Sequence, residues 1–598
     1  MCFSLLYGIE MGTTGMAAAL LLVAVLLHCT GTAMVRASHT VYPELQSLEV
    51  EKVDEMSRTG YHFQPPKHWI NDPNGPMYYK GLYHLFYQYN PKGAVWGNIE
   101  WAHSVSTDLI DWTALDPGIY PSKNFDIKGC WSGSATVLPS GMPIVMYTGI
   151  DPNDHQVQNL AYPKNLSDPF LREWVKPDYN PIISPDSGIN ASAFRDPTTA
   201  WLGPDKHWRL LVGSRVDDKG LAVLYRSRDF KRWVKAHHPL HSGLTGMWEC
   251  PDFFPVAVHG GSRHHRRGVD TAELHDRALA EEVKYVLKVS LDMTRYEYYT
   301  VGSYDHATDR YTPDAGFRDN DYGLRYDYGD FYASKSFYDP AKRRRILWGW
   351  ANESDTVPDD RRKGWAGIQA IPRKLWLSPG GKQLIQWPVE EVKALRGKHV
   401  NVSDQVVKGG QYFEVDGFKS VQSDVEVTFA VDDLSKAEQF NPKWFTDPQR
   451  LCKKRGAREK GEVGPFGLWV LAAGDLTERT AVFFRVFRTN TSRLVVLMCN
   501  DPTNSTFEAQ VYRPTFASFV NHDIAKTKTI ALRTLIDHSV VESFGAGGRT
   551  CILSRVYPKK ALGDNAHLFV FNHGEVDVKV AKLDAWEMRT PKMNAPAQ

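Results

Sequence analysis

Three short segments of the sequence set a carboxylate among aromatic and turn-forming residues. Asp72 lies in residues 69–75 (WINDPNG), Asp196 in 194–197 (FRDP) and Glu249 in 248–252 (WECPD). Taken alone, Asp72-Pro73-Asn74-Gly75 is typical of a turn, because proline presets φ and glycine accepts positive φ. Three such units, each just ahead of a strand-like run, instead predict hydrolysis of a glycosidic bond, which requires paired carboxyl groups.

A repeated unit of strands and turns would bring these carboxylates together. Between residues 61 and 390 the unit recurs at intervals of about sixty residues, and its copies begin near residues 72, 131, 196, 252 and 330. Repeats built from short strands are typical of radial architectures, so the sequence predicts a five-bladed β-propeller. The innermost strands would start near the axis, where Asp72, Asp196 and Glu249 converge.

The pattern changes after residue 390. Residues 391–400 are expected to form a linker with some helical character, and residues 401–590 show alternating strands at 423–429, 467–471, 481–487, 494–498 and 567–571. A separate C-terminal β-sandwich is therefore predicted, and the fold class is all-β. Cys452 and Cys499 are candidates for a disulfide across it, and closing such a loop is worth about 4 kcal/mol. A polar insertion at 259–282 is predicted to be a solvated surface loop.

The composition excludes some classes of function. The formal net charge of +2 is too small to indicate nucleic acid binding. The pI near 8.0 would leave the protein cationic in an acidic extracellular space, where anionic cell-wall polymers could hold it weakly. No cysteine spacing is typical of a zinc site, so we expect neither a metal nor an organic cofactor. The oligomeric state is left open.

Several features are typical of a secreted glycoprotein. An apolar run at residues 17–27 is too short to span a bilayer, and small residues suited to signal-peptidase cleavage follow it. We expect residues 1–37 to be a secretory signal, although the usual Lys or Arg before the run is absent. Six Asn-x-Ser/Thr sequons are candidates for glycosylation, at Asn165, Asn190, Asn352, Asn401, Asn490 and Asn504.

The three acidic segments, in this order and context, resemble the signatures of glycoside hydrolase family 32. The resemblance extends from about residue 61 to the C-terminus and is strongest to the plant cell-wall β-fructofuranosidases, also called acid invertases. It implies a five-bladed propeller followed by a β-sandwich, which agrees with the repeat pattern. It also implies a secreted enzyme of the cell wall that cleaves terminal non-reducing β-D-fructofuranosides, above all sucrose, without a cofactor.

The resemblance also implies a role for each carboxylate. Asp72 matches the nucleophile, Glu249 the acid/base, and Asp196 the residue that stabilises the transition state. Such an enzyme retains the anomeric configuration through a double displacement with an oxocarbenium-like transition state. Glu249 has to be protonated while Asp72 is ionised, and Trp248 and Cys250 are expected to contribute to that difference by desolvation.

Further residues match the substrate pocket of that family. The residues that would line the fructosyl site are Asn71, Gln88, Trp96, Trp131, Ser132 and Arg195. For the two tryptophans, ordinary packing inside a blade is the alternative interpretation. Asp292 resembles the acidic residue that accepts the glucose of sucrose, and Arg295, which we expect to orient it, stands where several relatives have lysine. Arginine keeps the charge but changes the geometry.

Two alternatives remain at the level of sequence. A fructan exohydrolase acting on inulin or levan would share all three carboxylates. A catalytically silent sugar-binding propeller, which belongs to another class of function, would be expected to have lost one of them.

Overall fold

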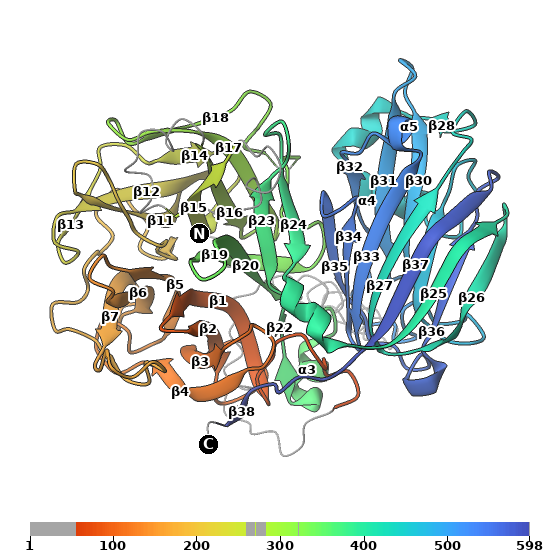
Figure 1. Cartoon of the computed structure of the whole chain (residues 1–598). Coiled ribbons are helices and arrows are strands. Elements are labelled where there is room, and N and C mark those ends of the chain that lie inside the picture. Colours follow the sequence, from red (N-terminus) through yellow and green to blue (C-terminus); the bar gives the residue numbers. More distant parts are fainter. Residues whose placement is uncertain (1–54, 259–268, 271–282, 321, 597–598) are drawn as a thin grey trace, which may run out of the picture.

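The computed structural model describes residues 55–258, 269–270, 283–320 and 322–596. Nearly all regular structure in these residues is β, in two parts that lie side by side (Figure 1). The predicted signal, residues 1–37, and most of the insertion at 259–282 lie outside the described residues. Among the helices of the described part, none is long and apolar enough to cross a membrane.

Five sheets form the N-terminal part, each built mainly from one continuous stretch of chain. The first contains β1 (His68–Tyr79), β2 (Leu82–Asn90), β3 (Glu100–Ser106) and β4 (Thr113–Ile119), with β21 (Trp365–Ala366) and β38 (Ala595–Pro596) at its edges. The second contains β5 (Cys130–Val137), β6 (Pro143–Ile150), β7 (Gln156–Pro163) and β8 (Trp174–Val175). The third contains β9 (Phe194–Arg195), β10 (Trp201–Leu202), β11 (Trp208–Val216), β12 (Lys219–Ser227), β13 (Trp233–Lys235) and β14 (His241–Gly243).

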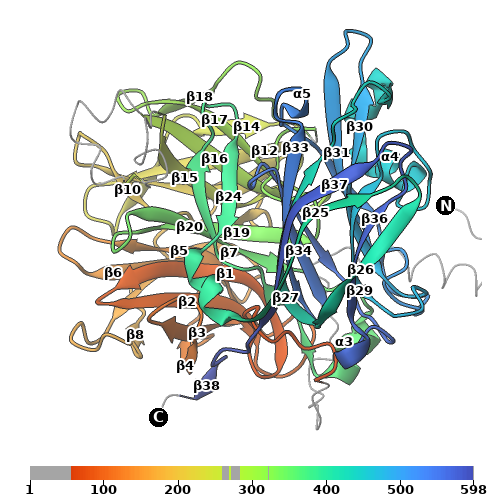
Figure 2. The same ribbon diagram turned by 45° about the vertical axis from the view of Figure 1, so that its right-hand side comes forward.

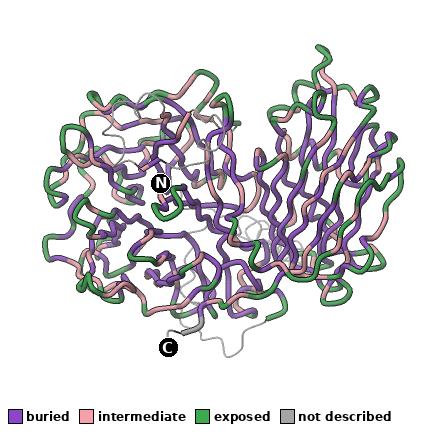
Figure 3. Tube along the Cα trace, viewed as in Figure 1, coloured by how far each residue is buried: buried purple, intermediate pink, exposed green. Residues whose placement is uncertain are grey.

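The last two of these sheets follow the same plan. The fourth contains β15 (Trp248–Ala257), β16 (Val283–Leu291), β17 (Glu297–Asp305) and β18 (Arg310–Pro313). The fifth contains β19 (Phe331–Asp339), β20 (Arg344–Ala351), β22 (Ile368–Gln369), β23 (Arg373–Leu377) and β24 (Leu384–Pro388). In Figure 1 the sheets follow one another in colour order, red to green, around a shared centre. Figure 3 shows that the strands around this centre are mostly buried and that the exposed residues lie mainly in the loops.

The strand nearest the centre carries an irregularity at an equivalent place in four sheets. The pairing register shifts between Ile70 and Pro73 in β1, and between Trp131 and Gly133 in β5. It shifts again between Glu249 and Asp252 in β15, and between Tyr332 and Lys335 in β19. Because a β-bulge breaks the strict alternation of side chains, it can re-aim residues that a regular strand would turn away.

Side-chain to backbone hydrogen bonds link neighbouring sheets near the centre. The Gly133 N–H donates to Asn74 Oδ1 at 3.2 Å, joining the second sheet to the first. The buried Lys288 Nζ, on the fourth sheet, donates to the carbonyl oxygen of Ser334, on the fifth, at 2.6 Å. These bonds satisfy backbone groups that the bulges leave unpaired and fix the sheets relative to one another.

A single capped helix lies between the strands of the fifth sheet in the described part of the chain. Helix α3 (Val357–Lys363) begins after Thr356, whose side chain accepts from the Asp359 N–H in a capping box, and it ends at Gly364 with φ of 77°. A 3-10 turn, η3 (Glu390–Leu395), then leads directly into β25 (Arg396–Val407), so residues 396–400 of the expected linker are part of a strand.

The C-terminal part has two sheets whose strands pack face to face (Figure 2). In order across the first sheet lie β25, β37 (Val578–Met588), β27 (Gln422–Ala430), β33 (Thr529–Asp537), β34 (Val540–Gly545) and β35 (Thr550–Arg555). The second has β26 (Gln411–Lys419), β36 (His567–Asn572), β29 (Phe466–Ala472), β30 (Thr480–Arg488), β31 (Leu494–Asp501) and β32 (Phe516–Val520), with β28 (Glu438–Gln439) beside β30. Short helical segments lie between strands of this part: η4 (Pro442–Thr446), α4 (Pro448–Lys454), α5 (Ile524–Thr527) and η5 (Gly563–Asn565).

Side chains from both sheets form one apolar core between them. Val425 and Phe429 of β27 meet Phe466 and Phe484 of the other sheet there. All five strands expected in this part are present, and α4 is joined to β31 by a disulfide between Cys452 and Cys499, with 6.1 Å between their Cα atoms. The C-terminal segment then returns to the first sheet, where β38 pairs in parallel with β4 (Figure 1).

Candidate active site

Asp72 lies inside β1, at its bulge, and accepts hydrogen bonds from neutral donors. Ser132 donates its hydroxyl hydrogen to Asp72 Oδ2 at 2.5 Å, and Asn71 Nδ2 donates to Oδ1 at 2.9 Å. Asn71 is itself held, because its Nδ2 also reaches Gln88 Oε1 at 2.7 Å and its Oδ1 accepts from Trp69 Nε1 at 2.8 Å. Asp72 is only 6% exposed, so these donors fix a largely buried carboxylate in position.

Asp196 and Asp72 face the same space, because one side chain contacts both. The Cys250 N–H donates to Asp196 Oδ2 at 2.9 Å, and Cys250 Sγ lies 3.5 Å from that oxygen and 3.6 Å from Asp72 Oδ2. Burial, followed by the charges of Asp196 and Asp72, raises the pKa of the Cys250 thiol well above its usual value. The thiol therefore stays protonated and can donate to the carboxylates. Asp196 and Cys250 both have positive φ, 70° and 44°, a costly conformation that tends to occur at functional sites.

Glu249 is the third carboxylate of the group, and it has charged neighbours. Arg195 donates to Glu249 Oε1 from Nε at 3.0 Å and from Nη2 at 2.8 Å. Tyr332 donates its hydroxyl hydrogen to Oε2, and Arg295 Nη1 lies 3.5 Å from the same oxygen. Burial opposes the charged form of Arg195, but Glu249 and Asp196 outweigh it and raise its pKa. The acidic segments that are far apart in sequence thus meet at one buried site.

One residue of this group was missed by the sequence analysis, and another has a role beyond the expected one. Tyr332 was not assigned a role, although it follows Asp330 and Phe331 at the start of the fifth repeat, a place equivalent to that of the other site residues. Cys250 was expected to contribute desolvation, and it also bridges two carboxylates. Trp248 differs from expectation, because its Nε1 donates to Thr245 at 2.8 Å and its ring packs with Leu291 and Tyr298 in the fourth sheet.

Asp292 and Arg295 lie at the edge of the same group but are not bonded to each other. Asp292 Oδ1 is buried and finds no hydrogen-bond partner among the described residues. Burial, and then the charge of Glu249, raise the pKa of Asp292, while Arg195, Arg295 and Arg215 act against that shift. The guanidinium of Arg295 instead lies over the Tyr332 ring, 4.8 Å from its centroid. The expected orientation of Asp292 by Arg295 is therefore replaced by a contact of Arg295 with Glu249 and Tyr332.

Aromatic side chains form a wall beside the carboxylates. Trp96 and Trp131 meet edge to face with ring centroids 5.5 Å apart. Both belong to a cluster that also contains Trp69, Cys250 and Tyr332. Apolar walls with a few polar groups are typical of pockets that bind small molecules, and aromatic faces suit the C–H surface of a sugar ring.

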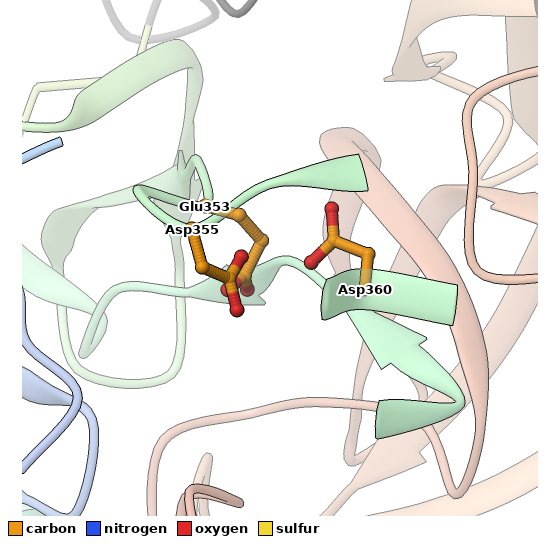
Figure 4. A group of neighbouring side chains, drawn as sticks. All are labelled: Glu353, Asp355 and Asp360. Atoms are coloured by element: carbon orange, nitrogen blue, oxygen red, sulfur yellow. The ribbon is translucent and has the colours of Figure 1, made fainter. Parts of the chain in front are cut away.

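A separate group of carboxylates could in principle hold a metal ion. Glu353, Asp355 and Asp360 converge beside α3 (Figure 4). Lys363 Nζ, however, lies 2.9 Å from Glu353 Oε2 and 3.0 Å from Asp360 Oδ1 and also bonds to Asp355. Arg555 Nη1 pairs with Glu353 at 2.6 Å. The protein's own cations therefore neutralise this cluster, and its donor set does not fit a metal site.

The sequons lie at positions of different accessibility. Asn165, Asn190, Asn401 and Asn490 are exposed, whereas Asn352 and Asn504 are partly buried. Because an oligosaccharide needs a free side chain on the surface, the four exposed positions fit glycosylation better than the other two.

Comparisons with known proteins give a consistent result. Residues 62–388 match the model of the glycosyl hydrolases family 32 N-terminal domain, and residues 391–587 match that of the family 32 C-terminal domain. The chain is 80% identical over 585 residues to beta-fructofuranosidase, insoluble isoenzyme 3, from Oryza sativa, which covers 98% of this chain and 100% of that one. It is 60% identical to the cell wall isozyme of beta-fructofuranosidase from Zea mays, with 93% and 95% covered.

A solved structure is similar over most of the chain. It is fructan 1-exohydrolase IIa from Cichorium intybus, with a TM-score of 0.87 and 48% identity, covering 91% of this chain and 99% of that chain.

Proposed function

This chain belongs to glycosyl hydrolase family 32, and from that membership we propose that it is a β-fructofuranosidase of the cell wall that hydrolyses sucrose to glucose and fructose. The observation that carries the proposal is the meeting of Asp72, Asp196 and Glu249 in one buried group. The 80% identity to a plant β-fructofuranosidase supports it. Secretion to the cell wall is supported by the names of the relatives, which are insoluble or cell wall isoenzymes.

The environments of the three carboxylates fit a retaining double displacement. Asp72, held by the neutral donors Ser132 and Asn71, would attack the anomeric carbon of the fructosyl unit. Glu249 would give its proton to the glycosidic oxygen, so that glucose leaves and a fructosyl ester forms on Asp72. Glu249 would then take a proton from water, whose oxygen attacks the same carbon and restores Asp72. Asp196 would hold fructosyl hydroxyls and stabilise the oxocarbenium-like transition state.

The contacts of Glu249 divide its two oxygens between different tasks. Arg195 holds Oε1 with two bonds, which fixes the plane of the carboxyl group. Oε2 is the oxygen that Tyr332 reaches, and we infer that it is the one that exchanges the proton. Burial, followed by the charge of Glu249, raises the pKa of Tyr332, so this phenol stays a donor.

We assign sucrose rather than fructan as the substrate because of the sequence identities. The sucrose assignment is supported by 80% identity to a β-fructofuranosidase, whereas the fructan exohydrolase is 48% identical. The similarity of that exohydrolase over 91% of the chain keeps inulin and levan as the second candidate class. The assignment is tested by measuring the release of free sugar from sucrose, inulin and levan by the purified protein and comparing the three kcat/KM values. A higher kcat/KM on either fructan than on sucrose would reverse the assignment.

A silent sugar-binding protein is the alternative of a different class. The presence of all three carboxylates argues against it. Replacing Asp72 by Ala distinguishes the two. An enzyme would lose turnover, whereas a binding protein would keep its sugar binding.

Several finer features belong to the same proposal. We infer that the five N-terminal sheets are the blades of a propeller over residues 61–390 and that residues 401–590 form a sandwich supporting it. We further propose that residues 1–37 are removed on secretion, that some of the six sequons carry glycans, and that anionic wall polymers hold the protein. The lining of the fructosyl pocket is assigned to Asn71, Gln88, Trp96, Trp131, Ser132 and Arg195, with Asp292 and Arg295 on the glucose side.

A further inference from the structure

A second cavity lies at the other end of the strands that carry the active site. It has a volume of about 560 Å³ and is lined by the C-terminal ends of β1, β5 and β19, by residues 199–202 and by Arg345. On β1, Asp72 and Met77 are five residues apart, which is about 15 Å along a strand. The cavity is therefore separate from the group of catalytic carboxylates, at the opposite end of the same strands.

The polar group that marks this cavity is the guanidinium of Arg345. The residue is only 7% exposed, yet no ion pair to it is found in the described part of the chain. Nη1 donates to Ser336 Oγ at 3.0 Å, whereas Nε is buried without a hydrogen-bond partner. Asp252 does not neutralise it by contact, because its Oδ2 accepts from the backbone N–H of Ser336 at 2.9 Å and from its hydroxyl at 2.6 Å.

A buried arginine with unused donors is unusual, since such groups are normally paired. Burial lowers the pKa of Arg345, and the charges of Asp252 and Asp270 offset this only in part. The fixed fork of a guanidinium matches the two oxygens of a carboxylate or phosphate. Arg345 lines a cavity of small-molecule size, and its Nη2 makes no hydrogen bond to the described residues, so the guanidinium points to an anionic ligand.

The other residues that line the cavity indicate which kind of anion fits. Tyr78, Trp208 and Tyr338 line the cavity and offer flat aromatic surfaces, as does Phe337. Asp270 also lines it, so a dianion such as a phosphate monoester would meet a carboxylate as well as the guanidinium. A single negative charge on a ring-shaped body is the better match. We propose that this cavity is a second ligand site, in which Arg345 binds the carboxylate of a small cyclic acid, either a sugar acid or an aromatic acid.

Titration calorimetry on the purified protein tests the site. Galacturonate represents the sugar acids and 4-hydroxybenzoate the aromatic acids, and galactose and 4-hydroxybenzamide are their neutral counterparts. Each is titrated up to about 10 mM, which detects dissociation constants in the millimolar range. We expect one of the two acids to bind, and its neutral counterpart to bind at least tenfold more weakly. Which acid binds identifies the class of ligand. Saturating fructose should leave this binding unchanged, because the active site lies elsewhere.

Two variants locate the binding. Arg345→Met keeps an apolar stem against the Phe254 ring, which the guanidinium now covers at 4.2 Å, and should weaken binding at least tenfold. Val137→Trp fills the cavity from a side chain that is 44% exposed, and it should block binding while Arg345 is intact. Arg343→Met, an exposed arginine on the neighbouring turn and outside the cavity, is the matched control and should bind like the unaltered protein.

Several results of these binding measurements would contradict the proposal. The proposal fails if neither acid binds, if the neutral counterparts bind as well as the acids, or if fructose displaces the acid. It also fails if Val137→Trp binds like the unaltered protein. Should Arg345→Met not fold, Val137→Trp alone decides. Sucrose turnover, measured in parallel, reports on the catalytic group and stays unchanged in Val137→Trp and Arg343→Met, so failure of this proposal leaves the proposed function standing.

Discussion

Single side chains give Asp72 and Glu249, the proposed nucleophile and acid/base, different surroundings. Asp72 accepts from a serine hydroxyl and an asparagine amide, whereas Glu249 is held by an arginine fork and a tyrosine. Neutral donors orient a nucleophile and cancel less of its charge than a bonded cation would. The arginine fork leaves Glu249 little freedom to rotate, and precise placement of a proton donor is worth several powers of ten in rate.

Replacing Glu249 by Gln should abolish most turnover of sucrose and leave the fold intact. Glutamine keeps bonds to Arg195 and Tyr332 but cannot protonate the departing glucose, so kcat should fall by about 10²- to 10⁴-fold. Fructosyl fluoride, whose leaving group needs no proton, should be hydrolysed with a much smaller loss. Steady-state rates on both substrates provide the measurement, and circular dichroism checks the fold. An equal loss on both would rule out the acid role.

Replacing Asp292 by Ala should lower the ratio of sucrose to inulin activity. Its buried Oδ1 has no partner in the described protein, so we expect it to accept from a hydroxyl of the glucose of sucrose. Losing a charged hydrogen bond costs on the order of 1.5–3 kcal/mol, or about tenfold to a hundredfold in kcat/KM. Inulin presents fructose in place of glucose, so the kcat/KM for inulin should fall less. The contrary result is a ratio of the two kcat/KM values that does not change.

At the scale of elements, the irregular inner strands place the site. In β1, β5, β15 and β19 the register shift falls at or beside a residue of the site: Asp72, Ser132, Glu249 and Tyr332. A regular strand points successive side chains to opposite faces, so two adjacent residues cannot both face the centre. The bulges lift that restriction, and Asn71 and Asp72 accordingly bond to each other and to the same group of neighbours. Consecutive residues therefore reach the same site.

Removing the disulfide should destabilise the C-terminal part without altering the chemistry. It ties α4 to β31 across 47 residues. On the chain-entropy model the double variant Cys452→Ala, Cys499→Ala should lose up to about 4 kcal/mol of unfolding free energy. Urea unfolding measures the loss, and sucrose KM should stay unchanged. Adding reductant should lower the free energy of unfolding of the unaltered protein and not that of the double variant. Equal sensitivity of both proteins to reductant would assign the effect to other cysteines.

At the scale of the whole molecule, buried charges fasten the two parts together. Arg373 of β23, fully buried, pairs with Asp327 at 2.7 Å and with Glu542 of the sandwich strand β34 at 2.8 Å. His62, also buried, lies 2.9 Å from Asp537 and 3.1 Å from Glu542. Breaking one partner of such a network leaves an uncompensated buried charge, which typically costs about 3–5 kcal/mol. The orientation of the two parts is thus fixed at specific points.

His62 should make the stability of this junction depend on pH. Burial disfavours the imidazolium, but hydrogen bonds to Asp537 and Glu542 outweigh it and raise the pKa of His62 above its usual 6.5. A raised pKa means that the folded state binds the proton more tightly than the unfolded state. The stabilisation is therefore complete below about pH 6.5 and is lost as the pH rises through the folded value. A tenfold difference in proton affinity between the two states corresponds to about 1.4 kcal/mol of unfolding free energy.

Urea unfolding at about pH 5 and about pH 8 tests this dependence. The free energy of unfolding should fall between these values by a larger amount in the unaltered protein than in His62→Gln. His237→Gln, which removes an exposed histidine, is the matched control and should follow the unaltered protein. If the free energy of unfolding of His62→Gln falls by the same amount as that of the control, another group is responsible for the pH dependence.

The sequence by itself determined the all-β class, the change of pattern after residue 390 and the three carboxylates. These follow from local chemistry, because strand alternation, turn residues and acidic side chains can be recognised without knowing what lies beside them. The strands expected between 423 and 571 were correct for the same reason, and the candidate disulfide between Cys452 and Cys499 is present. Residues Asp72, Asp196 and Glu249 were named correctly as members of one group, since equivalent positions in repeats face a common centre.

Only the tertiary structure decided which side chains complete that group. Asp72-Pro73-Asn74-Gly75 has the composition of a turn, yet it lies within the bulged strand β1, because pairing with β2 outweighs the local preference. Tyr332 and Cys250 join the site through contacts with carboxylates 83 and 178 residues away, a separation that no local pattern encodes. Arg295 contacts Glu249 rather than Asp292 for the same reason. Buried charges choose partners by distance and desolvation in three dimensions, and those quantities exist only once the chain has folded.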